Sequence, residues 1–203
     1  MTIFAMRLKH LSGTGSTPGS VFSRAVGILH EQAAGKFALG FPEARNGARD
    51  ADGARKEPSL GKEMVVYAQD KDCLIDLKSA LDDLADYLHF GRAIEAHGGV
   101  FVCHRRVQNL YRGTPAAIER RLRRTMTLAA AREKPLTEAE IASRRRAAEK
   151  PQPESELPYL NIRSRSTGQR FALSFSTEPA TERGSWSFDS YGFAKPGAAV
   201  PAL

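Results

Sequence analysis

The feature that most constrains the fold is the order of apolar patterns over the first half of the chain. Four stretches alternate apolar and polar side chains or form short apolar runs, which is typical of strands. Two others repeat their apolar side chains at helical spacing. Strand, helix, strand, strand, helix, strand is the order of a ferredoxin-like βαββαβ domain, which we expect over residues 1–100 and which hosts many functions. The strands are expected at 2–10, 36–41, 62–68 and 98–110, and the helices at 20–35 and 71–88.

Local signals support the two helices. Pro18 is placed to start the first helix, and Asp70 is placed to cap the second. The segment 43–61 has no periodicity and many Gly, Asp and Arg residues, so it predicts a loop. The second helix carries a row of leucines in heptad-like register: Leu74, Leu77, Leu81, Leu84 and Leu88.

A second domain is expected over residues 101–203, which makes the chain α+β. Thr114 and Pro115 are an N-cap followed by proline at the first helical position, so we expect a helix at about 115–130. A capping box from Thr137 to Glu140 predicts a second helix. Beyond a Pro-rich linker, strand-like pieces predict a small antiparallel sheet with a strand-turn-strand over 157–193. These pieces are 159–164, 170–176 and 185–193.

The charge of the chain is concentrated in this second half. The net charge is +7, but residues 1–100 hold 12 Lys/Arg against 13 Asp/Glu, whereas residues 101–203 hold 18 against 10. Such asymmetry points to a nucleic-acid surface built mostly from the second half. A generally basic, solvated surface is the alternative.

Arginine accounts for much of this charge. Between residues 101 and 124 there are seven arginines and one acid. Like charges three and four residues apart on a helix repel each other, so a face of this kind is favoured where phosphates relieve the repulsion. A solvated helix face is the alternative to phosphate binding. The helical arginines are Arg120, Arg121, Arg123 and Arg124.

Several classes of function are not expected. Cys73 and Cys103 fall in elements that read as buried, which indicates reduced thiols in a cytoplasmic protein. The five histidines show no metal-ligand spacing, so neither a metal nor another cofactor is expected. No stretch approaches the ~18 apolar residues of a membrane helix, and the N-terminus lacks the pattern of a signal peptide.

Residues 163–171, "RSRSTGQRF", form an unusual turn between two expected strands. The segment holds three arginines, two serines and one phenylalanine but no acid. Cationic groups without a local partner are typical of a site for an external anion.

The sequence resembles the repeat-processing endoribonucleases of type I-F CRISPR systems, in the RAMP superfamily. The motifs "ILHEQ", "FALGFPE", "YLHFG", "RRVQ", the Arg-rich helix, "IRSRSTGQRF" and "YGFAKPGAAVP" occur in the order and spacing of that family. The resemblance implies an enzyme that cuts a CRISPR repeat stem-loop at the 3′ base of its stem and leaves a 2′,3′-cyclic phosphate. It also implies that the protein stays on the mature crRNA, as a single copy with the other subunits of the type I-F surveillance complex.

The resemblance also implies the catalytic residues. His30 matches the catalytic histidine, Ser164 the serine that holds the ribose 2′-hydroxyl, and Tyr191 a tyrosine that helps to orient the histidine. Attack by the 2′-hydroxyl of the substrate needs only positioning and proton transfer, which suits imidazole, whose ordinary pKa is about 6.5.

The RNA contacts are implied in the same way. Arg106 and Gln108 match a pair that reads base edges low in the stem, and Phe171 matches a phenylalanine that stacks at its base. Arginine suits guanine and glutamine suits adenine. The other expected RNA-binding residues are the four helical arginines and Arg163, Arg165, Ser166 and Thr167.

Each residue also has a simpler interpretation. His30 could be a half-exposed surface residue, Tyr191 and Phe171 could be core residues, and the serines could cap the Thr167-Gly168 turn. The alternative function is a catalytically inert subunit that binds an RNA hairpin. The basic residues serve both functions, whereas His30, Ser164 and Tyr191 favour the enzyme.

Overall fold

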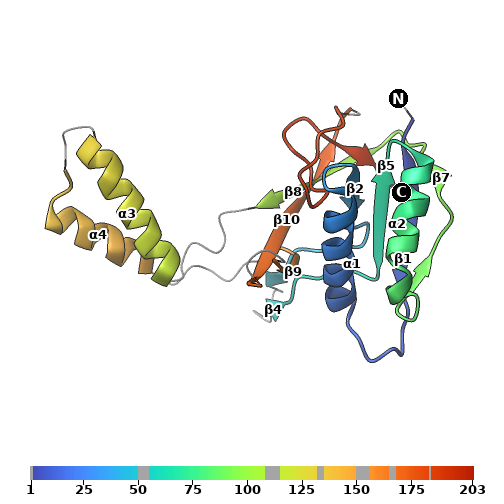
Figure 1. Ribbon diagram of the computed structural model, residues 1–203, viewed down its shortest axis with the longest axis horizontal. Helices are drawn as coiled ribbons and strands as arrows, with labels where there is room; N and C mark the ends of the chain where they lie inside the picture. The colour runs from blue at the N-terminus through green and yellow to red at the C-terminus, as the bar shows by residue number, and fades with distance from the viewer. Residues whose placement is uncertain are drawn as a thin grey trace. The chain divides into compact units, whose positions relative to one another are not determined.

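The computed structural model describes residues 2–49, 55–107, 115–131, 135–149, 156–164, 168–182 and 184–203 (Figure 1). The chain forms two compact units. Met1–Val107 and Glu156–Leu203 make up the first, here called the two-sheet unit, and Gln108–Ser155 the second, here called the helical hairpin.

The first sheet has the predicted ferredoxin-like topology. Its antiparallel strands lie in the order β2-β5-β1-β6, so the first strand is central and pairs with the third and fourth. The prediction of residues 98–110 as the fourth strand was wrong, because Phe101–Val107, the strand that the structure describes within that stretch, belongs to the second sheet. The strands are β1 (Phe4–His10), β2 (Phe37–Gly40), β5 (Glu63–Ala68) and β6 (Leu88–Phe90), and the short β7 (Ile94–Glu95) also pairs with β1.

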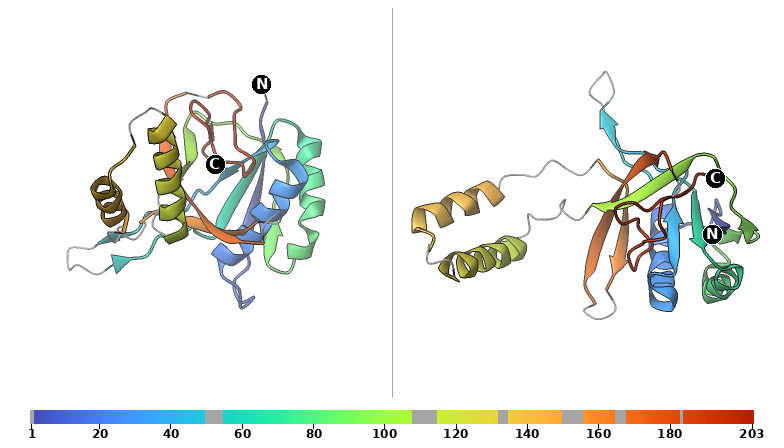
Figure 2. Two further views of the ribbon diagram at one scale, coloured as in Figure 1. Left: turned by 60° about the vertical axis from the view of Figure 1, so that its left-hand side comes forward. Right: turned by 90° about the horizontal axis from the view of Figure 1, so that it is seen from above.

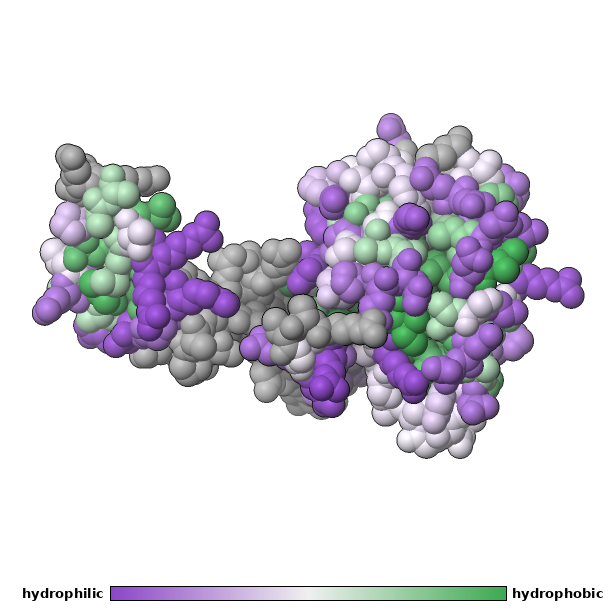
Figure 3. All heavy atoms as spheres, in the orientation of Figure 1, coloured by the Kyte–Doolittle hydropathy of each residue, from purple (hydrophilic) through white to green (hydrophobic). Residues whose placement is uncertain are grey.

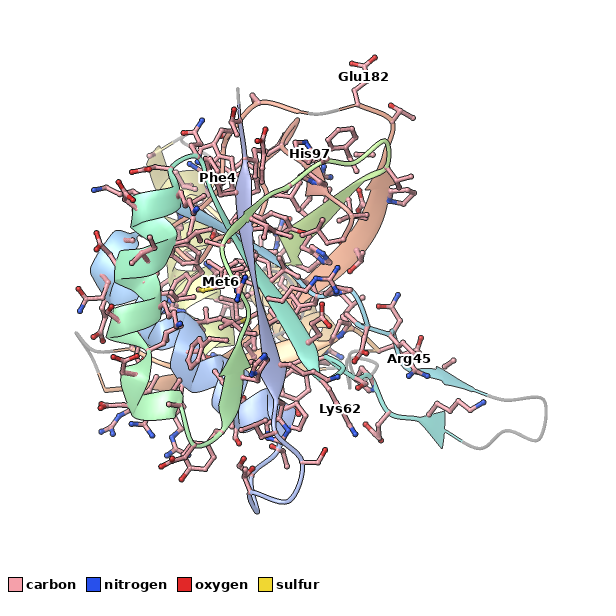
Figure 4. All side chains as sticks on the ribbon, turned by 90° about the vertical axis from the view of Figure 1, so that its right-hand side faces the viewer. Phe4, Met6, Arg45, Lys62, His97 and Glu182 are labelled. Atoms are coloured by element: carbon pink, nitrogen blue, oxygen red, sulfur yellow. The ribbon has the colours of Figure 1, made fainter. Side chains whose placement is uncertain are left out.

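Two helices cover one face of this sheet, α1 (Pro18–Ala33) and α2 (Lys71–Ala80). Figure 4 shows both on the same side of β1, which Phe4 and Met6 mark. The Thr17 and Asp70 side chains accept backbone N–H groups at the two N-termini, as N-caps do.

The second helix ends earlier than predicted. It stops at Ala80, and a 3₁₀ turn, η1, follows at Asp82–Leu84. Asp82 and Asp83 lie just beyond its C-terminus, where carboxylates oppose the helix dipole. Leu84 and Leu88 are still buried, so the heptad-like row reports core positions and not helix length.

The second sheet has four strands, in the order β11-β8-β10-β9. Residues 185–193 were predicted as a strand, and this is wrong. They form turns, with one isolated bridge between Phe188 and Ala194. The predicted loop 43–61 contains a short hairpin of β3 (Ala48–Arg49) and β4 (Arg55–Lys56). The strands of the second sheet are β8 (Phe101–Val107), β9 (Tyr159–Arg163), β10 (Arg170–Ala180) and β11 (Val200–Pro201).

The two sheets share hydrophobic cores. The larger core joins residues of α1 and the first sheet to Ile162, Phe175 and Phe193. Helix α1 lies between α2 and β9 (Figures 1 and 2), and the Ser23 hydroxyl accepts the Asn161 N–H of that edge strand at 2.9 Å. The boundaries of the compact units, at residues 107 and 156, differ from the predicted domain boundary at residue 100. The division into two domains at residue 100 stays a prediction.

Buried polar contacts also join the sheets. The Phe41 N–H donates to Nε2 of His104 at 3.2 Å, so the other ring nitrogen carries the hydrogen and donates to the Thr177 hydroxyl at 3.0 Å. Tyr67 donates to the Pro201 carbonyl at 2.7 Å. Burial raises the pKa of Tyr67 and lowers that of His104 to about 4, so both are neutral near pH 7.

The helical hairpin contains α3 (Pro115–Ala131) and α4 (Glu138–Glu149). Leu122 is buried, and Glu119 pairs with Arg145 at 2.5 Å. The predicted capping box is present, since Glu140 N–H donates to Thr137 and Thr137 N–H donates back to the Glu140 carboxylate. Figure 3 shows hydrophilic side chains gathered along part of this unit. Within the described ranges, no helix is long and apolar enough to cross a membrane.

Candidate functional site

The site begins at the last turn of α1, where the imidazole of His30 has a fixed hydrogen bond. Nδ1 of His30 lies 2.8 Å from the Ser190 carbonyl oxygen. A carbonyl only accepts, so Nδ1 carries the hydrogen and donates. In the neutral ring, Nε2 is therefore the nitrogen with an available lone pair.

The ring of Tyr191 lies flat against this imidazole. The two centroids are 4.0 Å apart and the planes differ by 13°. Phe171 meets the Tyr191 ring edge-on at 6.0 Å, and the guanidinium carbon of Arg106 lies 5.8 Å from its centroid. Burial raises the pKa of the Tyr191 hydroxyl, with Arg106 opposing the shift and Asp189 adding to it, so this phenol stays protonated near neutral pH.

A tight turn presents Ser190 and Tyr191 to α1. Asp189 accepts the backbone N–H groups of Tyr191 at 2.9 Å and Phe193 at 3.0 Å through Oδ1, and Gly192 N–H donates to the Asp189 carbonyl. Gly192 has a φ of +80°, and a Cβ there would lie 2.6 Å from the ring of Phe37. Glycine is therefore required at this position.

Ser164 reaches the same place from the end of β9. Its N–H donates to the Gln169 carbonyl at 2.7 Å across the base of the arginine-containing turn. His30, Arg163, Ser164 and Tyr191 line one cavity of about 380 Å³. Three residues that are far apart in the sequence, which we expected to be catalytic, thus lie around one hollow.

The other expected residues lie in several places. Arg106 is part-buried beside Tyr191, Arg163 is exposed at the cavity, and Phe171 is part-buried against the core. In the helical hairpin, Arg120, Arg123 and Arg124 are exposed, and Arg121 lies in α3. Four expected residues lie outside the described ranges: Gln108, Arg165, Ser166 and Thr167.

Sequence reasoning missed Asp189 and Ser190. A signal was available, because aspartate at the first position and glycine at the fourth of "DSYG" is typical of a type I turn.

A larger cavity of about 590 Å³ lies elsewhere in the two-sheet unit, where Lys36, Cys73 and Trp186 contribute to its lining. Among the residues that the structure describes, no three His, Cys, Asp or Glu side chains are grouped to hold a metal ion.

One comparison with known proteins, a family model, covers most of the chain. Residues 18–203 match the family model described as "CRISPR-associated protein (Cas_Csy4)". No curated protein sequence matches the chain. A solved structure described as "CRISPR associated protein Cas6" is similar, with 8% sequence identity, a TM-score of 0.38 and 98% of both chains covered.

Two further solved structures are similar at the same level. One is described as "An RAMP protein binding different RNA substrates", with 13% identity, a TM-score of 0.33 and 98% of both chains covered. The other is described as "Characterization of a Cas6-related gene from Pyrococcus furiosus", with 12% identity, a TM-score of 0.31 and coverage of 98% of this chain and 97% of that chain.

Proposed function

The chain belongs to the CRISPR-associated Cas_Csy4 family, and from this we propose that it cuts the stem-loop of a CRISPR repeat transcript at the 3′ base of the stem without a metal ion. Family membership supports the binding and processing of CRISPR repeat RNA in general. The cleavage chemistry and the roles of individual residues are the further content of the proposal.

The proposed reaction is an internal transfer at one phosphate of the RNA. The ribose 2′-oxygen forms a bond to phosphorus while the bond from phosphorus to the 5′-oxygen breaks. The 2′-hydroxyl proton passes to Nε2 of His30, and the departing 5′-oxygen takes up a proton from solvent. The products are a 2′,3′-cyclic phosphate and a 5′-hydroxyl, so no enzyme nucleophile is needed.

The observation that carries this proposal is the meeting of His30, Ser164 and Tyr191 around one cavity. The hydrogen bond from Nδ1 to the Ser190 carbonyl leaves Nε2 as the proton acceptor, which general base catalysis requires. Tyr191 restricts the tilt of the imidazole, and Ser164 supplies a hydroxyl that can hold the 2′-hydroxyl. Arg163 at the same cavity provides positive charge for the phosphate.

The rest of the proposal concerns binding. The exposed Arg120, Arg123 and Arg124 of α3 contact phosphates of the stem, because a helix in the A-form groove meets mainly the backbone. Arg106 reads a base edge low in the stem. After cleavage the protein stays on the crRNA as one subunit of the type I-F surveillance complex in the cytoplasm.

A cleavage assay with two labelled repeat hairpins tests the mechanism. One hairpin is all RNA and the other has a 2′-deoxy sugar at the expected cut, and both are incubated in EDTA. We expect the RNA to be cut and the deoxy hairpin to bind without being cut. Cutting of the deoxy hairpin, or loss of activity in EDTA, would falsify the mechanism. Tight binding of both with no cutting would identify an inert hairpin-binding subunit instead.

A further inference from the structure

The side chain of Asp189 interacts in two directions. Its Oδ1 accepts the backbone N–H groups of Tyr191 and Phe193, and its Oδ2 lies 4.0 Å from Nη1 of Arg106. The Asp189 and Arg106 side chains are 24% and 30% exposed, so the pair lies at the surface of the two-sheet unit but is not fully solvated.

Arg106, held by this ion pair, lies beside the candidate cleavage site. It leaves β8 on the same face as the buried His104, two residues earlier, because side chains alternate along a strand. Its guanidinium lies beside the ring of Tyr191, which in turn stacks on His30. Contacts therefore run from the part-buried Arg106, through Asp189 and Tyr191, to the imidazole.

We propose that Asp189 is a positioning residue that aims Arg106 at a guanine at the foot of the RNA stem and sets the turn that carries Tyr191. This inference rests on the proposed function and adds to it a physical link between base recognition and the cleavage site. Asp189 itself touches neither the base nor the reacting phosphate.

The chemistry of the two groups supports this role. A guanidinium has five N–H donors, and Asp189 faces only one of its terminal nitrogens, so a bidentate pair of donors is left for guanine O6 and N7. An ion pair of 4.0 Å between part-exposed groups contributes little to folding stability, which leaves orientation of the arginine as its main effect. The two hydrogen bonds to Oδ1 come from uncharged backbone N–H groups, and an amide oxygen can also accept them.

The two roles of Asp189 separate in two variants. Asp189→Asn keeps an oxygen for the Tyr191 and Phe193 N–H groups but removes the charge that faces Arg106. Asp189→Ala removes both. The probe is a synthetic RNA hairpin carrying the repeat transcribed beside the gene, compared with the same hairpin with the base pairs at the foot of its stem inverted.

The measured ratio is the dissociation constant of the inverted hairpin divided by that of the repeat hairpin. We expect Asp189→Asn to lower this ratio by about 2- to 5-fold, the range that a weak ion pair supplies. Asp189→Ala should lower the ratio equally and also slow single-turnover cleavage at saturating RNA, because the Tyr191 turn is loosened. If Asp189 served folding alone, neither variant would change the ratio. Circular dichroism melts of both variants check that each is folded.

A double-mutant cycle decides the link to Arg106. In the Arg106→Ala background, Asp189→Asn should change the ratio no further. The same change in both backgrounds overturns the inference, as does a wild type that binds both hairpins equally. The ratio is measured by binding, so a wild type that discriminates but does not cut would overturn the proposed function and leave this test valid.

Discussion

The imidazole of His30 and the phenol of Tyr191 lie nearly parallel, 4.0 Å apart, although 160 residues separate the histidine from the Ser190 carbonyl that it binds. The ring contact and the hydrogen bond act on the same side chain. Together they leave the imidazole little freedom to rotate, and under the proposed mechanism its Nε2 is the nitrogen that accepts the proton.

Removal of the imidazole should separate binding from cutting. His30→Ala should bind the repeat hairpin almost as tightly as the wild type, because the arginines and Phe171 are unchanged. Its cleavage should fall by about 10²- to 10⁴-fold, the usual contribution of general acid-base catalysis. His97→Ala is the matched control, since that side chain is 78% exposed and outside the site, and it should cut normally. Full activity of His30→Ala would remove the histidine from the mechanism.

Tyr191 should act through its ring and not through its hydroxyl. Tyr191→Phe keeps the stacked contact and should retain most of the cleavage rate. Tyr191→Ala should lose roughly 2- to 10-fold, the value of an aromatic pair of about 0.5–1.5 kcal/mol. Single-turnover rates of both variants test this, and an equal loss in both would assign the effect to the hydroxyl.

The arginines of α3 should determine the salt dependence of binding. Each phosphate contact contributes about 0.7–0.9 to the slope of log K against log salt. Glutamine at Arg120, Arg123 or Arg124 should lower that slope for at least one of the three. Arg92→Gln, a change at an exposed arginine of the two-sheet unit, is the control and should leave the slope unchanged. Unchanged slopes in all three α3 variants would favour a solvated helix face.

Phe171 should contribute to RNA binding as a stacking platform. Phe171→Ala should weaken hairpin binding by roughly 1–3 kcal/mol, the value of one base-aromatic contact. The ring is only part-buried, so the variant should remain folded by circular dichroism. An unfolded variant would show instead that Phe171 is mainly a core residue.

Acid should destabilise the protein through His104. Burial lowers its pKa in the folded protein from the ordinary 6.5 to about 4, so the unfolded chain takes up a proton first as the pH falls. The contribution of His104 to the free energy of unfolding is therefore complete above pH 6.5 and is lost between pH 6.5 and 4, by roughly 3 kcal/mol in all. Denaturant titrations at several pH values should show this loss, and His104→Gln should show a shallower one. Equal slopes for both proteins would mean that other groups dominate.

Local patterns predicted most of the elements but not the sheet to which each strand belongs. The strand at Phe101–Val107 was expected, yet it pairs with β10 and β11 and not with β1. Pairing is decided by contacts across the chain, and an apolar run has the same appearance in either sheet. Leu88–Phe90 takes the vacant edge beside β1, although it is too short to stand out by periodicity.

The residues of the candidate site could be predicted from sequence motifs, but the turn that holds them could not. His30, Ser164 and Tyr191 were expected from motifs and do share a cavity. The stretch around Tyr191 was mistaken for a strand, because Trp186 and Phe188, and again Tyr191 and Phe193, are spaced by two residues, although the two pairs are out of phase with each other. Its turn depends on the Asp189 side chain and on Gly192, and with them the role of Asp189 was missed.

The hydrogen bond between His30 and Ser190 also affects when the protein can become active during its synthesis. The ribosome makes α1 early, but the turn that holds its histidine follows 160 residues later, which takes roughly 10–30 s at ordinary rates of synthesis. A nascent or prematurely terminated chain that lacks this turn has an imidazole without its carbonyl partner or stacked ring. Under the proposed mechanism, such an unfinished chain is expected not to cut RNA.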